Sequence, residues 1–402
     1  MSGKLHHPGR RRFLKGVAAG FGAAATASFV PTRFAIGQQA KIKLGLLLPY
    51  SGTYASLGHN ITDGLKLRLQ EAGGRLGGRE VEIIQLDSEA NPAKAPANTN
   101  KLIAGEKVDF LIGPVHSGVA MAMAKIVREE GTIMINPNAG ADAVTGPMCA
   151  PNIFRTSFSN WQPCYPMGKV MMENGHKRVV TMSWKYAAGQ EMLDAFADGF
   201  KAAGGTIVKE LYVPFPDVEF QAQLTEIASL KPDAVFVFFS GGGAIKYMKD
   251  YAAAGLKDSI PLYGPGFLTD GTLEAAGAAG EGLFTTLHYA DDLDNELNKK
   301  FRAAFKNATK RDADVFAVQG YDTGTLLLQG VNAVKGDVTA KKEIIAAMER
   351  AEIDSPRGKF TMSKAHNPIQ DIYLRKSVNG VNKFVRVAAK AVEDPAKGCR
   401  MA

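Results

Sequence analysis

A serine at the start of a predicted helix has the surroundings best suited to ligand chemistry. Ser117 lies in the turn Gly113–Gly118, which follows an apolar run and opens a helical pattern. The first N–H groups of a helix lack partners within it, so with the Ser117 hydroxyl they can hold an anion such as a carboxylate. Charge-assisted hydrogen bonds of this kind are strong. Taken alone, however, the turn fits a simpler alternative better, in which Ser117 only caps its own helix.

Residues for catalysis or metal binding do not occur at the required spacings. The sequence has no Gly-x-x-x-x-Gly-Lys-Ser/Thr phosphate loop, no His-Glu-x-x-His, no Cys-x-x-Cys and no Gly-x-Ser-x-Gly. The glycines at 241–243 lack the spacing of a dinucleotide-binding turn. The seven histidines are scattered, with no pair at helical metal-ligand spacing. We therefore expect no catalytic residues, no metal site and no cofactor, and we predict that the protein is not an enzyme.

The elements that position these turns follow an alternating pattern. Short β-rich runs are separated by helical patterns and lie at Ile42–Leu48, Val81–Asp87, Asp109–Ile112 and Thr132–Asn136. The pattern restarts at Arg178–Ser183 and continues through Thr206–Val213, Asp233–Phe239 and Pro261–Tyr263. This alternation indicates an α/β fold of two lobes, each with a central parallel sheet flanked by helices. Ligands of such sheets bind beyond the carboxyl ends of the strands, where Ser117 lies.

The last third of the chain is mainly helical and ends in three short β runs. Helices after the second lobe suggest that the chain crosses back to complete the first. We expect lobe 1 to comprise residues 41–158 and 287–355, and lobe 2 to comprise 159–286 and 356–390, followed by a tail at 391–402. Short crossovers would join the lobes and allow them to hinge.

The excess positive charge is concentrated at the N-terminus. The chain has 402 residues, 48 basic and 40 acidic, but six of the basic ones and no acidic one lie in residues 1–40. The remaining chain is nearly neutral, which argues against nucleic-acid binding. The basic run Arg10–Lys15 precedes the uncharged, Ala/Gly-rich stretch Gly16–Thr32, as in an export signal, and resembles a twin-arginine signal, with Gly9 where Ser or Thr is usual. We predict a signal segment at 1–40 and a periplasmic protein, exported by the twin-arginine route.

Three cysteines fit an oxidising compartment without forming a disulfide scaffold. Cys149 and Cys164 are close enough in sequence to close a short loop. They are either bridged or two small buried side chains. Cys399 lies in the polar tail and is expected to be unpaired.

A series of short motifs resembles the leucine/isoleucine/valine-binding protein family, the type I solute-binding proteins of ABC importers. The motifs occur in order and at matching spacing, at Leu48–Gly52, Gly113–Gly118, Ile135–Pro137, Phe154–Thr156, Tyr186–Gly189 and Gly320–Asp322. The resemblance covers about residues 41–390, and the series is far more specific than any one motif.

This resemblance implies two lobes that close over a small ligand. In the family, two turns of the first lobe hold the ligand carboxylate through hydroxyl and backbone groups, a tyrosine comes from the other lobe, and an aromatic residue lies near the ligand side chain. The positions that match here are Tyr54, Ser117, Asn138, Ala139, Gly140 and Tyr186. The resemblance also implies an ABC permease as partner, and we expect a monomer.

One position departs from the family pattern. Amino-acid binders carry an acidic residue after a Gly-Pro in the second lobe, to pair with the ligand ammonium, but this chain has Gly266 there. Burying an ammonium without a counter-charge costs several kcal/mol. The glycine is expected to leave room, and Phe267 and Trp184 could join the two tyrosines around a flat ring, unless they are lobe core. We therefore predict a small carboxylate with an apolar, aromatic body as ligand. The alternatives are a branched-chain amino acid paired by another carboxylate, or a sensor with the same fold.

Overall fold

The computed structural model describes residues 40–401, so the predicted signal segment falls outside the described residues except for Ala40. The first sheet has the strand order β2-β3-β1-β4-β5-β6. All its neighbouring strands are parallel except β2, which pairs antiparallel with β3. The strand bounds are β1 Ile42–Leu48, β2 Arg75–Leu76, β3 Arg79–Asp87, β4 Phe110–Ile112, β5 Ile133–Asn136 and β6 Ile153–Arg155.

The second sheet has the order β12-β13-β14-β11-β10-β9-β7-β8, with β15 paired to β14. Strands β7 to β11 run parallel to one another, whereas β14 runs antiparallel to both β11 and β15. The bounds are β7 Arg178–Lys185, β8 Thr206–Pro214, β9 Ala234–Phe238, β10 Leu262–Pro265, β11 Phe284–Leu287, β12 Glu352–Ile353, β13 Phe360–Met362, β14 Pro368–Val378 and β15 Val381–Val392.

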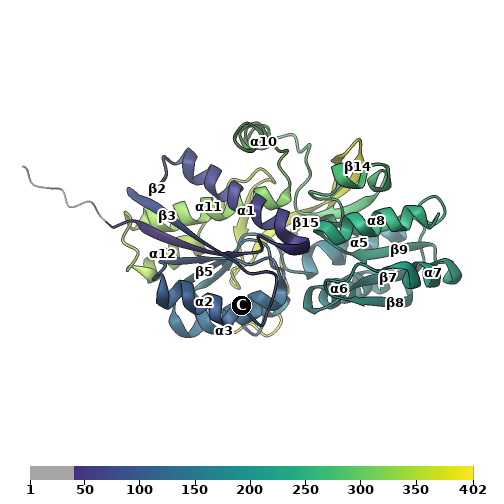
Figure 1. Cartoon of the computed structure of the whole chain (residues 1–402), viewed down its shortest axis with the longest axis horizontal. Helices are drawn as coiled ribbons and strands as arrows, with labels where there is room; N and C mark the ends of the chain where they lie inside the picture. The colour runs from purple at the N-terminus through teal and green to yellow at the C-terminus, as the bar shows by residue number, and fades with distance from the viewer. Residues whose placement is uncertain (1–39, 402) are drawn as a thin grey trace, which may run out of the picture. The chain divides into compact units, whose positions relative to one another are not determined.

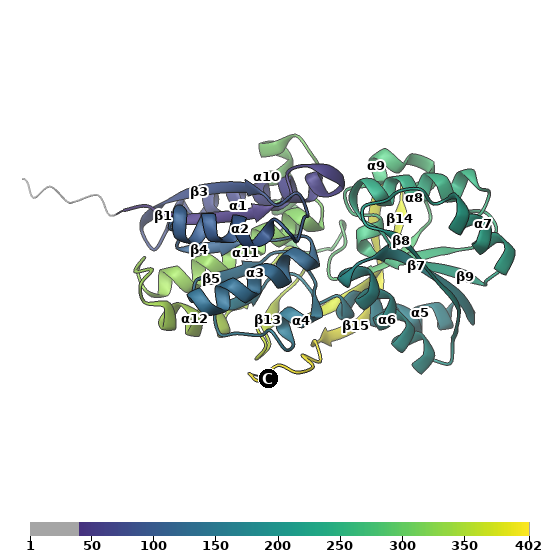
Figure 2. The ribbon, with the colours of Figure 1, turned by 60° about the horizontal axis from the view of Figure 1, so that its bottom comes forward.

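Helices cover both sheets (Figures 1 and 2). The α-helices are α1 Ala55–Glu71, α2 Ala95–Asn100, α3 Ser117–Glu130, α4 Asp142–Thr145, α5 Trp161–Glu173, α6 Ala187–Ala202, α7 Gln221–Leu230, α8 Gly241–Ala253, α9 Leu273–Ala276, α10 Glu296–Thr309, α11 Val315–Ala333 and α12 Lys341–Glu349. Short turns of other helix types lie at Gly52–Tyr54, Lys101–Gly105, Gly266–Leu268 and Gly277–Gly280. We call the first sheet with its helices lobe 1 and the second sheet with its helices lobe 2.

Side chains along the strands of lobe 1 point alternately to the two faces of the sheet, and a different layer of helices covers each face. Leu44 and Leu46 belong to the cluster of buried side chains that includes α1 and α11. Leu47 and Leu111 belong to the cluster formed with α2 and α3 on the opposite face. Successive side chains of a strand point to opposite faces, so an almost continuous apolar run such as Ile42–Leu48 is what a sheet covered on both faces requires.

Two glycines bring the late helix α11 back onto lobe 1. A Cβ at Gly64 of α1 would lie 2.0 Å from the carbonyl oxygen of Ala317, and one at Gly320 of α11 would lie 1.9 Å from that of Ile61. Only glycine permits this approach of the two backbones. The chain thus passes between the lobes after β6, after β11 and again after α12. The predicted two-lobed α/β fold is confirmed.

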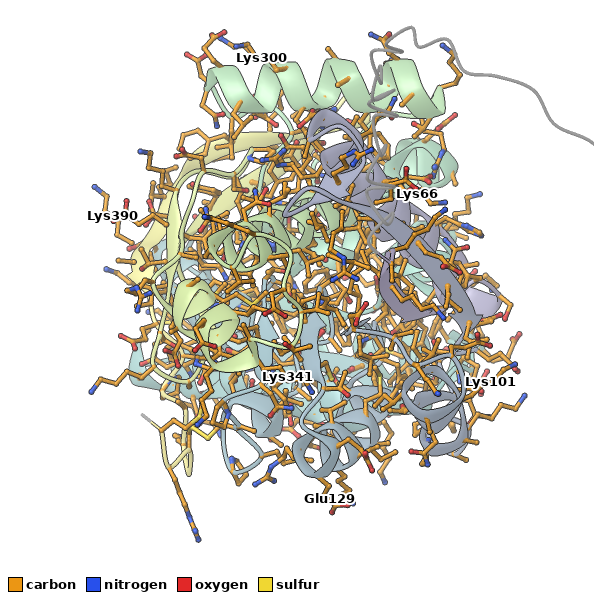
Figure 3. The ribbon with its side chains drawn as sticks, turned by 90° about the vertical axis from the view of Figure 1, so that its left-hand side faces the viewer. Lys66, Lys101, Glu129, Lys300, Lys341 and Lys390 are labelled. Atoms are coloured by element: carbon orange, nitrogen blue, oxygen red, sulfur yellow. A yellow bond between two sulfur atoms is a disulfide. The ribbon has the colours of Figure 1, made fainter. Side chains whose placement is uncertain are left out.

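Many charged side chains lie on the outside, whereas Arg155, Arg375 and Asp270 are buried. Lys66, Lys101, Lys300 and Lys390 are exposed and point away from the ribbon (Figure 3). Within residues 40–401, no helix combines the length and the apolar character that a membrane span requires.

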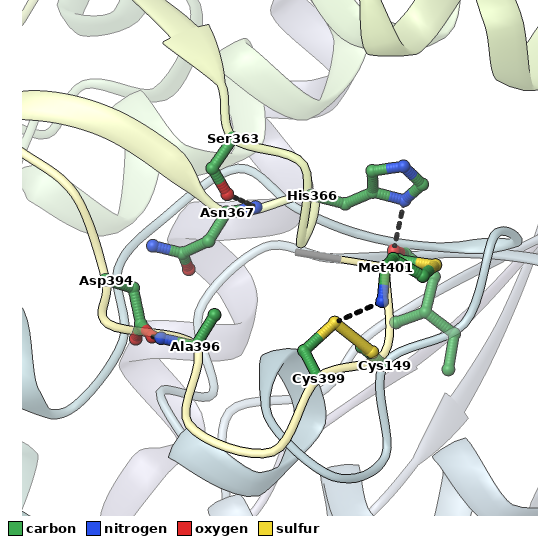
Figure 4. Close-up of a disulfide and its surroundings, with 9 residues drawn as sticks. Cys149, Ser363, His366, Asn367, Asp394, Ala396, Cys399 and Met401 are labelled. Atoms are coloured by element: carbon green, nitrogen blue, oxygen red, sulfur yellow. Dashed lines mark hydrogen bonds between the residues drawn. A yellow bond between two sulfur atoms is a disulfide. The ribbon is translucent and has the colours of Figure 1, made fainter.

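The disulfide differs from the sequence-based interpretation. Cys149, which follows α4 in lobe 1, is bonded to Cys399 in the tail beyond β15, with their Cα atoms 5.6 Å apart and 250 residues between them in sequence (Figure 4). Cys164 is a free, fully buried thiol on α5. Of the two alternatives for Cys149 and Cys164, the bridge is therefore wrong, and Cys164 is a buried side chain of the core. The expectation of an unpaired Cys399 is also wrong, because the tail returns to Cys149 of lobe 1.

Candidate functional site

A cavity lies between the lobes where the parallel strands end. The space between its lining residues, including the part open to solvent, is about 300 Å³. Lobe 1 and the segments leaving it contribute Tyr54, Leu57, Val115, Ser117, Asn138, Gly140, Phe158, Asn160 and Phe316. Lobe 2 contributes Tyr186, Ala188, Met192, Phe238, Ser240 and Phe267. This is the edge at which parallel α/β sheets bind ligands.

Ser117 is the first residue of α3 and is almost fully buried. It does not cap the helix: the cap is His116, whose Nδ1 accepts a hydrogen bond of 3.1 Å from the N–H of Gly118. Instead, Ser117 lines the cavity, and its Oγ lies 3.4 Å from Nδ2 of Asn160, which donates to it. The capping alternative for Ser117 is therefore wrong, and its hydroxyl faces the space where a ligand would bind.

The turn after β5 lies beside Ser117. Asn138 lines the cavity while its amide Nδ2 donates to Oε1 of Gln319 on α11 at 2.7 Å, which fixes the amide orientation. Gly140 also lines it, and its carbonyl oxygen accepts from the N–H of Asn160 at 2.7 Å. Ala139 lies behind this surface, since its N–H and carbonyl bond to lobe 1 groups and its side chain packs into the lobe 1 core.

Two tyrosines meet across the lobes. The hydroxyl of Tyr54, just before α1, lies 2.9 Å from the hydroxyl of Tyr186, just before α6. Burial raises the pKa of both phenols well above its ordinary value, so both are neutral and can donate a hydrogen bond. His116 stacks on the Tyr186 ring at 4.6 Å between centroids, and burial lowers the pKa of this histidine to about 4. This edge of the cavity is therefore aromatic and uncharged.

Phe267 and Trp184, both predicted as ring partners, differ in position. Phe267 lines the cavity and packs on Phe158 with 4.6 Å between ring centroids. Trp184 is fully buried behind the cavity, where its Nε1 donates to the carbonyl of Asp217 and its ring packs on Phe239. The alternative that Trp184 is lobe core is thus the correct one.

Gly266 does not open onto the cavity. An added Cβ would lie 2.2 Å from Nη2 of Arg375 and 2.6 Å from the Leu287 side chain. Arg375 donates to the Gly266 carbonyl at 3.1 Å and forms a fully buried ion pair of 2.8 Å with Asp270. The expectation that this glycine leaves room for a ligand was wrong, since Arg375 of the protein itself fills that room.

The cavity lining carries no charged side chain among the residues that the structure describes. Six of the predicted binding residues meet there: Tyr54, Ser117, Asn138, Gly140, Tyr186 and Phe267. Sequence reasoning missed Asn160, Phe158 and Ser240. The first two follow β6, a strand of three residues that the apolar pattern did not reveal. Within residues 40–401, no cluster of three or more His, Cys, Asp or Glu side chains could hold a metal ion.

The two lobes and the uncharged cavity between them define a two-lobed binding protein with the type I periplasmic-binding-protein fold. The sequence matches the family described as periplasmic binding protein over residues 41–382, and the chain belongs to this family. A Leu/Ile/Val-binding protein homolog from Brucella melitensis is 31% identical over 342 residues, which cover 83% of this chain and 87% of the homolog.

Two solved structures from Rhodopseudomonas palustris are also similar. An ABC-transporter solute-binding protein in complex with benzoate is 56% identical, with a TM-score of 0.88, covering 90% of this chain and 100% of that one. Another, in complex with 3,4-dihydroxybenzoic acid, is 32% identical, with a TM-score of 0.84, covering 88% and 99%. The protein is thus a periplasmic solute-binding component of an ABC transporter and not an enzyme; such proteins work with permease subunits.

Proposed function

We propose that the protein binds a small aromatic monocarboxylate of the benzoate class between its lobes and delivers it to an ABC permease. The observation that carries the proposal is the cavity lining, which combines aromatic rings with hydroxyl and amide groups but has no charged side chain in the described chain. An α-amino acid would bury its ammonium there without a counter-charge, at a cost of several kcal/mol.

The ligand carboxylate is assigned to the polar side of the cavity. Ser117 offers a hydroxyl beside the N-terminus of α3, and Asn138 offers the amide N–H that it does not donate to Gln319. The partial positive charge of the helix N-terminus favours an anion, and hydroxyl and amide donors supply charge-assisted bonds. A carboxylate therefore finds donors here, whereas an ammonium, which only donates, finds no carboxylate among the lining residues.

The aromatic body is assigned to the remaining surface. Phe158 and Phe267 form one tilted pair, and Tyr54 and Tyr186 close the cavity with their hydroxyl contact. Aromatic rings pack on one another in offset or tilted arrangements with gains of about 0.5–1.5 kcal/mol beyond burial. The solved relatives bound to benzoate and to 3,4-dihydroxybenzoic acid support this class of ligand.

A branched-chain amino acid is the second candidate, favoured by the names of the Brucella relatives. It would need a carboxylate for its ammonium. Glu191 comes nearest to that role, since its Oε2 accepts from Asn160 Nδ2 at 2.6 Å, but it lies behind Asn160 and already accepts the N–H of Asp142. Aromatic acids therefore fit better.

A thermal-shift panel separates the two candidates. Benzoate, 4-hydroxybenzoate and leucine are added to the mature chain at pH 7. A ligand at one hundred times its Kd stabilises the folded state by about 2.7 kcal/mol, so benzoate or 4-hydroxybenzoate is expected to raise Tm by several degrees and leucine to leave it unchanged. Stabilisation by leucine alone would overturn the proposal in favour of the second candidate.

Several further features belong to the same proposal. The basic and apolar segment within residues 1–40 directs export by the twin-arginine route, and the protein acts as a monomer. Lobe 1 comprises residues 41–158 and 287–355 and lobe 2 comprises 159–286 and 356–390, except that β12 (Glu352–Ile353) and the end of β15 belong to the second sheet and so to lobe 2. Ligand binding stabilises the closed arrangement, which the permease distinguishes from the open one.

A further inference from the structure

Two carboxylates accept backbone N–H groups of the opposite lobe where the lobes meet beside the cavity. Glu191, on α6 of lobe 2, accepts the N–H of Asp142 at the start of α4 in lobe 1, at 3.0 Å. Asp142 in turn accepts the N–H of Trp161 at the start of α5 in lobe 2, at 3.2 Å. Each lobe thus supplies one carboxylate to a helix start of the other. We call Asp142 and Glu191 the carboxylate clasp.

The clasp is connected to the ligand cavity through Asn160. The same Oε2 of Glu191 accepts from Nδ2 of Asn160 at 2.6 Å. Asn160 lines the cavity, donates its backbone N–H to Gly140 and lies within 3.4 Å of the Ser117 hydroxyl. Glu191 therefore sets which way the Asn160 amide faces, from the adjacent helix of the same lobe.

The surroundings of the clasp hold more negative than positive charge. Asp394 of the tail, 6% exposed, faces the same place, and its Oδ2 has no hydrogen-bond partner within the described residues. The buried cation is Arg155 of β6, whose guanidinium donates to the backbone carbonyls of Ala141 and Phe158. Among the described residues, the charges of Asp142, Glu191 and Asp394 thus all act on the one buried guanidinium of Arg155.

The other titratable groups nearby do not remove this imbalance. Cys164 on α5 and Tyr186 before α6 are neutral, because burial raises the pKa of each. Lys397 is exposed and lines an adjoining cavity with Asp142 and Asp394, through which solvent can reach the clasp. One bound proton would offset part of the excess negative charge.

We propose that closure of the lobes is proton-linked: bringing Asp142 and Glu191 together converts one carboxylate to a neutral carboxyl with a proton from solvent, and Glu191 is the positioning residue that carries this event to Asn160. The inference rests on the proposed function in that a bound aromatic acid closes the lobes. The chemistry is a single protonation, so no other reactant is required.

The direction of the pH effect follows from the closed arrangement. Burial, then the charges of Glu191 and Asp394, raise the pKa of Asp142 from its ordinary value near 4 to about 8, and burial also raises the pKa of Glu191. The closed state then holds a proton that the open state, with separated carboxylates, does not. Ligand affinity is highest at low pH, falls as the pH rises towards about 8 and levels off above it. One proton changes Kd by at most about tenfold per pH unit.

The test is a calorimetric titration of benzoate into the mature protein from pH 5.5 to 9, where benzoate stays ionised, in buffers of different ionisation enthalpy. We expect proton uptake on binding below pH 8 and a Kd that rises with pH. Glu191→Gln and, as a second variant, Asp142→Asn are expected to reduce both effects. Asp198→Asn, an exposed acid on the same helix, is the matched control and should behave like the wild type.

A ligand-free measurement keeps this inference separate from the proposed function. Small-angle scattering of the unliganded protein is expected to show a smaller radius of gyration at pH 6 than at pH 9, and Glu191→Gln should lose that difference. Absence of benzoate binding at every pH contradicts the proposed function. Benzoate binding with constant Kd, no proton uptake and no change in radius overturns the proton-linked clasp.

Discussion

The two sides of the ligand cavity differ in chemistry. Lobe 1 and the segment after β6 present Ser117, Asn138 and Asn160, beside the N-terminus of α3. Lobe 2 presents mainly apolar and aromatic groups, including Phe238 and Phe267. The amide groups are thus gathered on the lobe 1 side of the cavity, whereas aromatic rings line it from both sides. This division implies that lobe 1 holds the charged end first and that lobe 2 then closes over the body of the ligand.

The largest expected effect comes from restoring the acid that amino-acid binders have. Gly266→Asp places a Cβ against Arg375 and a second carboxylate beside the buried Arg375–Asp270 pair. Overpacking and disruption of a buried ion pair should lower the free energy of unfolding by about 3 kcal/mol or more. Urea denaturation measures this loss. A stable Gly266→Asp protein that binds leucine would show that the position does open onto the cavity.

A smaller effect is expected on the polar side. Ser117→Ala removes a hydroxyl assigned to the ligand carboxylate, and a hydrogen bond to a charged group contributes about 1.5–3 kcal/mol, so benzoate affinity should fall about 10- to 100-fold. Tm without ligand should barely change, because His116 caps α3. Ser229→Ala, at an exposed position, is the matched control for calorimetry. Unchanged benzoate affinity in Ser117→Ala would place the carboxylate elsewhere.

On the aromatic side, Phe267→Leu keeps the apolar volume and removes the ring. Loss of aromatic packing of about 0.5–1.5 kcal/mol should weaken benzoate about 3- to 10-fold. An aliphatic acid such as 4-methylpentanoate should lose little, whereas Ser117→Ala should weaken both acids equally. Calorimetry on the two variants measures these affinities. A loss confined to benzoate in Phe267→Leu would show that Phe267 binds the ring and not the carboxylate. Equal losses for both acids in Phe267→Leu would contradict it.

The smallest effect is expected where the two lobes touch. Tyr54→Phe removes the 2.9 Å contact between the hydroxyls of Tyr54 and Tyr186, leaving the aromatic packing in place. One neutral hydrogen bond contributes about 0.5–1.5 kcal/mol, so closure should weaken and the benzoate off-rate rise about 2- to 10-fold. Stopped-flow displacement measures this rate. An unchanged off-rate would show that the hydroxyl contact does not hold the closed state.

The architecture could be predicted because the order of apolar and polar residues within one strand or helix is a local signal. Runs such as Ile42–Leu48 and Ala234–Phe238 carry the pattern of strands buried on both faces, and both are central strands. The turn with Ser117 could be found because it follows such a strand, and sheet topology then gathers it with Tyr186 from the other lobe. Candidate ligand-binding residues at the ends of strands can therefore be identified from the order of strands, turns and helices along the chain.

Contacts between distant segments could not be predicted in this way. Gly266 was taken to leave room for a ligand, but Arg375 fills that space. Cys149 pairs with Cys399 across 250 residues, which no local spacing indicates. A glycine in the sequence shows that its own side chain is absent, but it does not show which distant residue occupies the space beside it.

The central claim, that the cavity accepts a carboxylate but has no partner for an ammonium, is tested most directly by two ligands that differ only in that group. Calorimetric titration of the wild-type protein at pH 7 compares 4-methylpentanoate with leucine, which adds an α-ammonium to the same carbon skeleton. We predict that 4-methylpentanoate binds at least about 100-fold more tightly, since burying the unpaired ammonium costs several kcal/mol. Tighter binding of leucine would contradict the account.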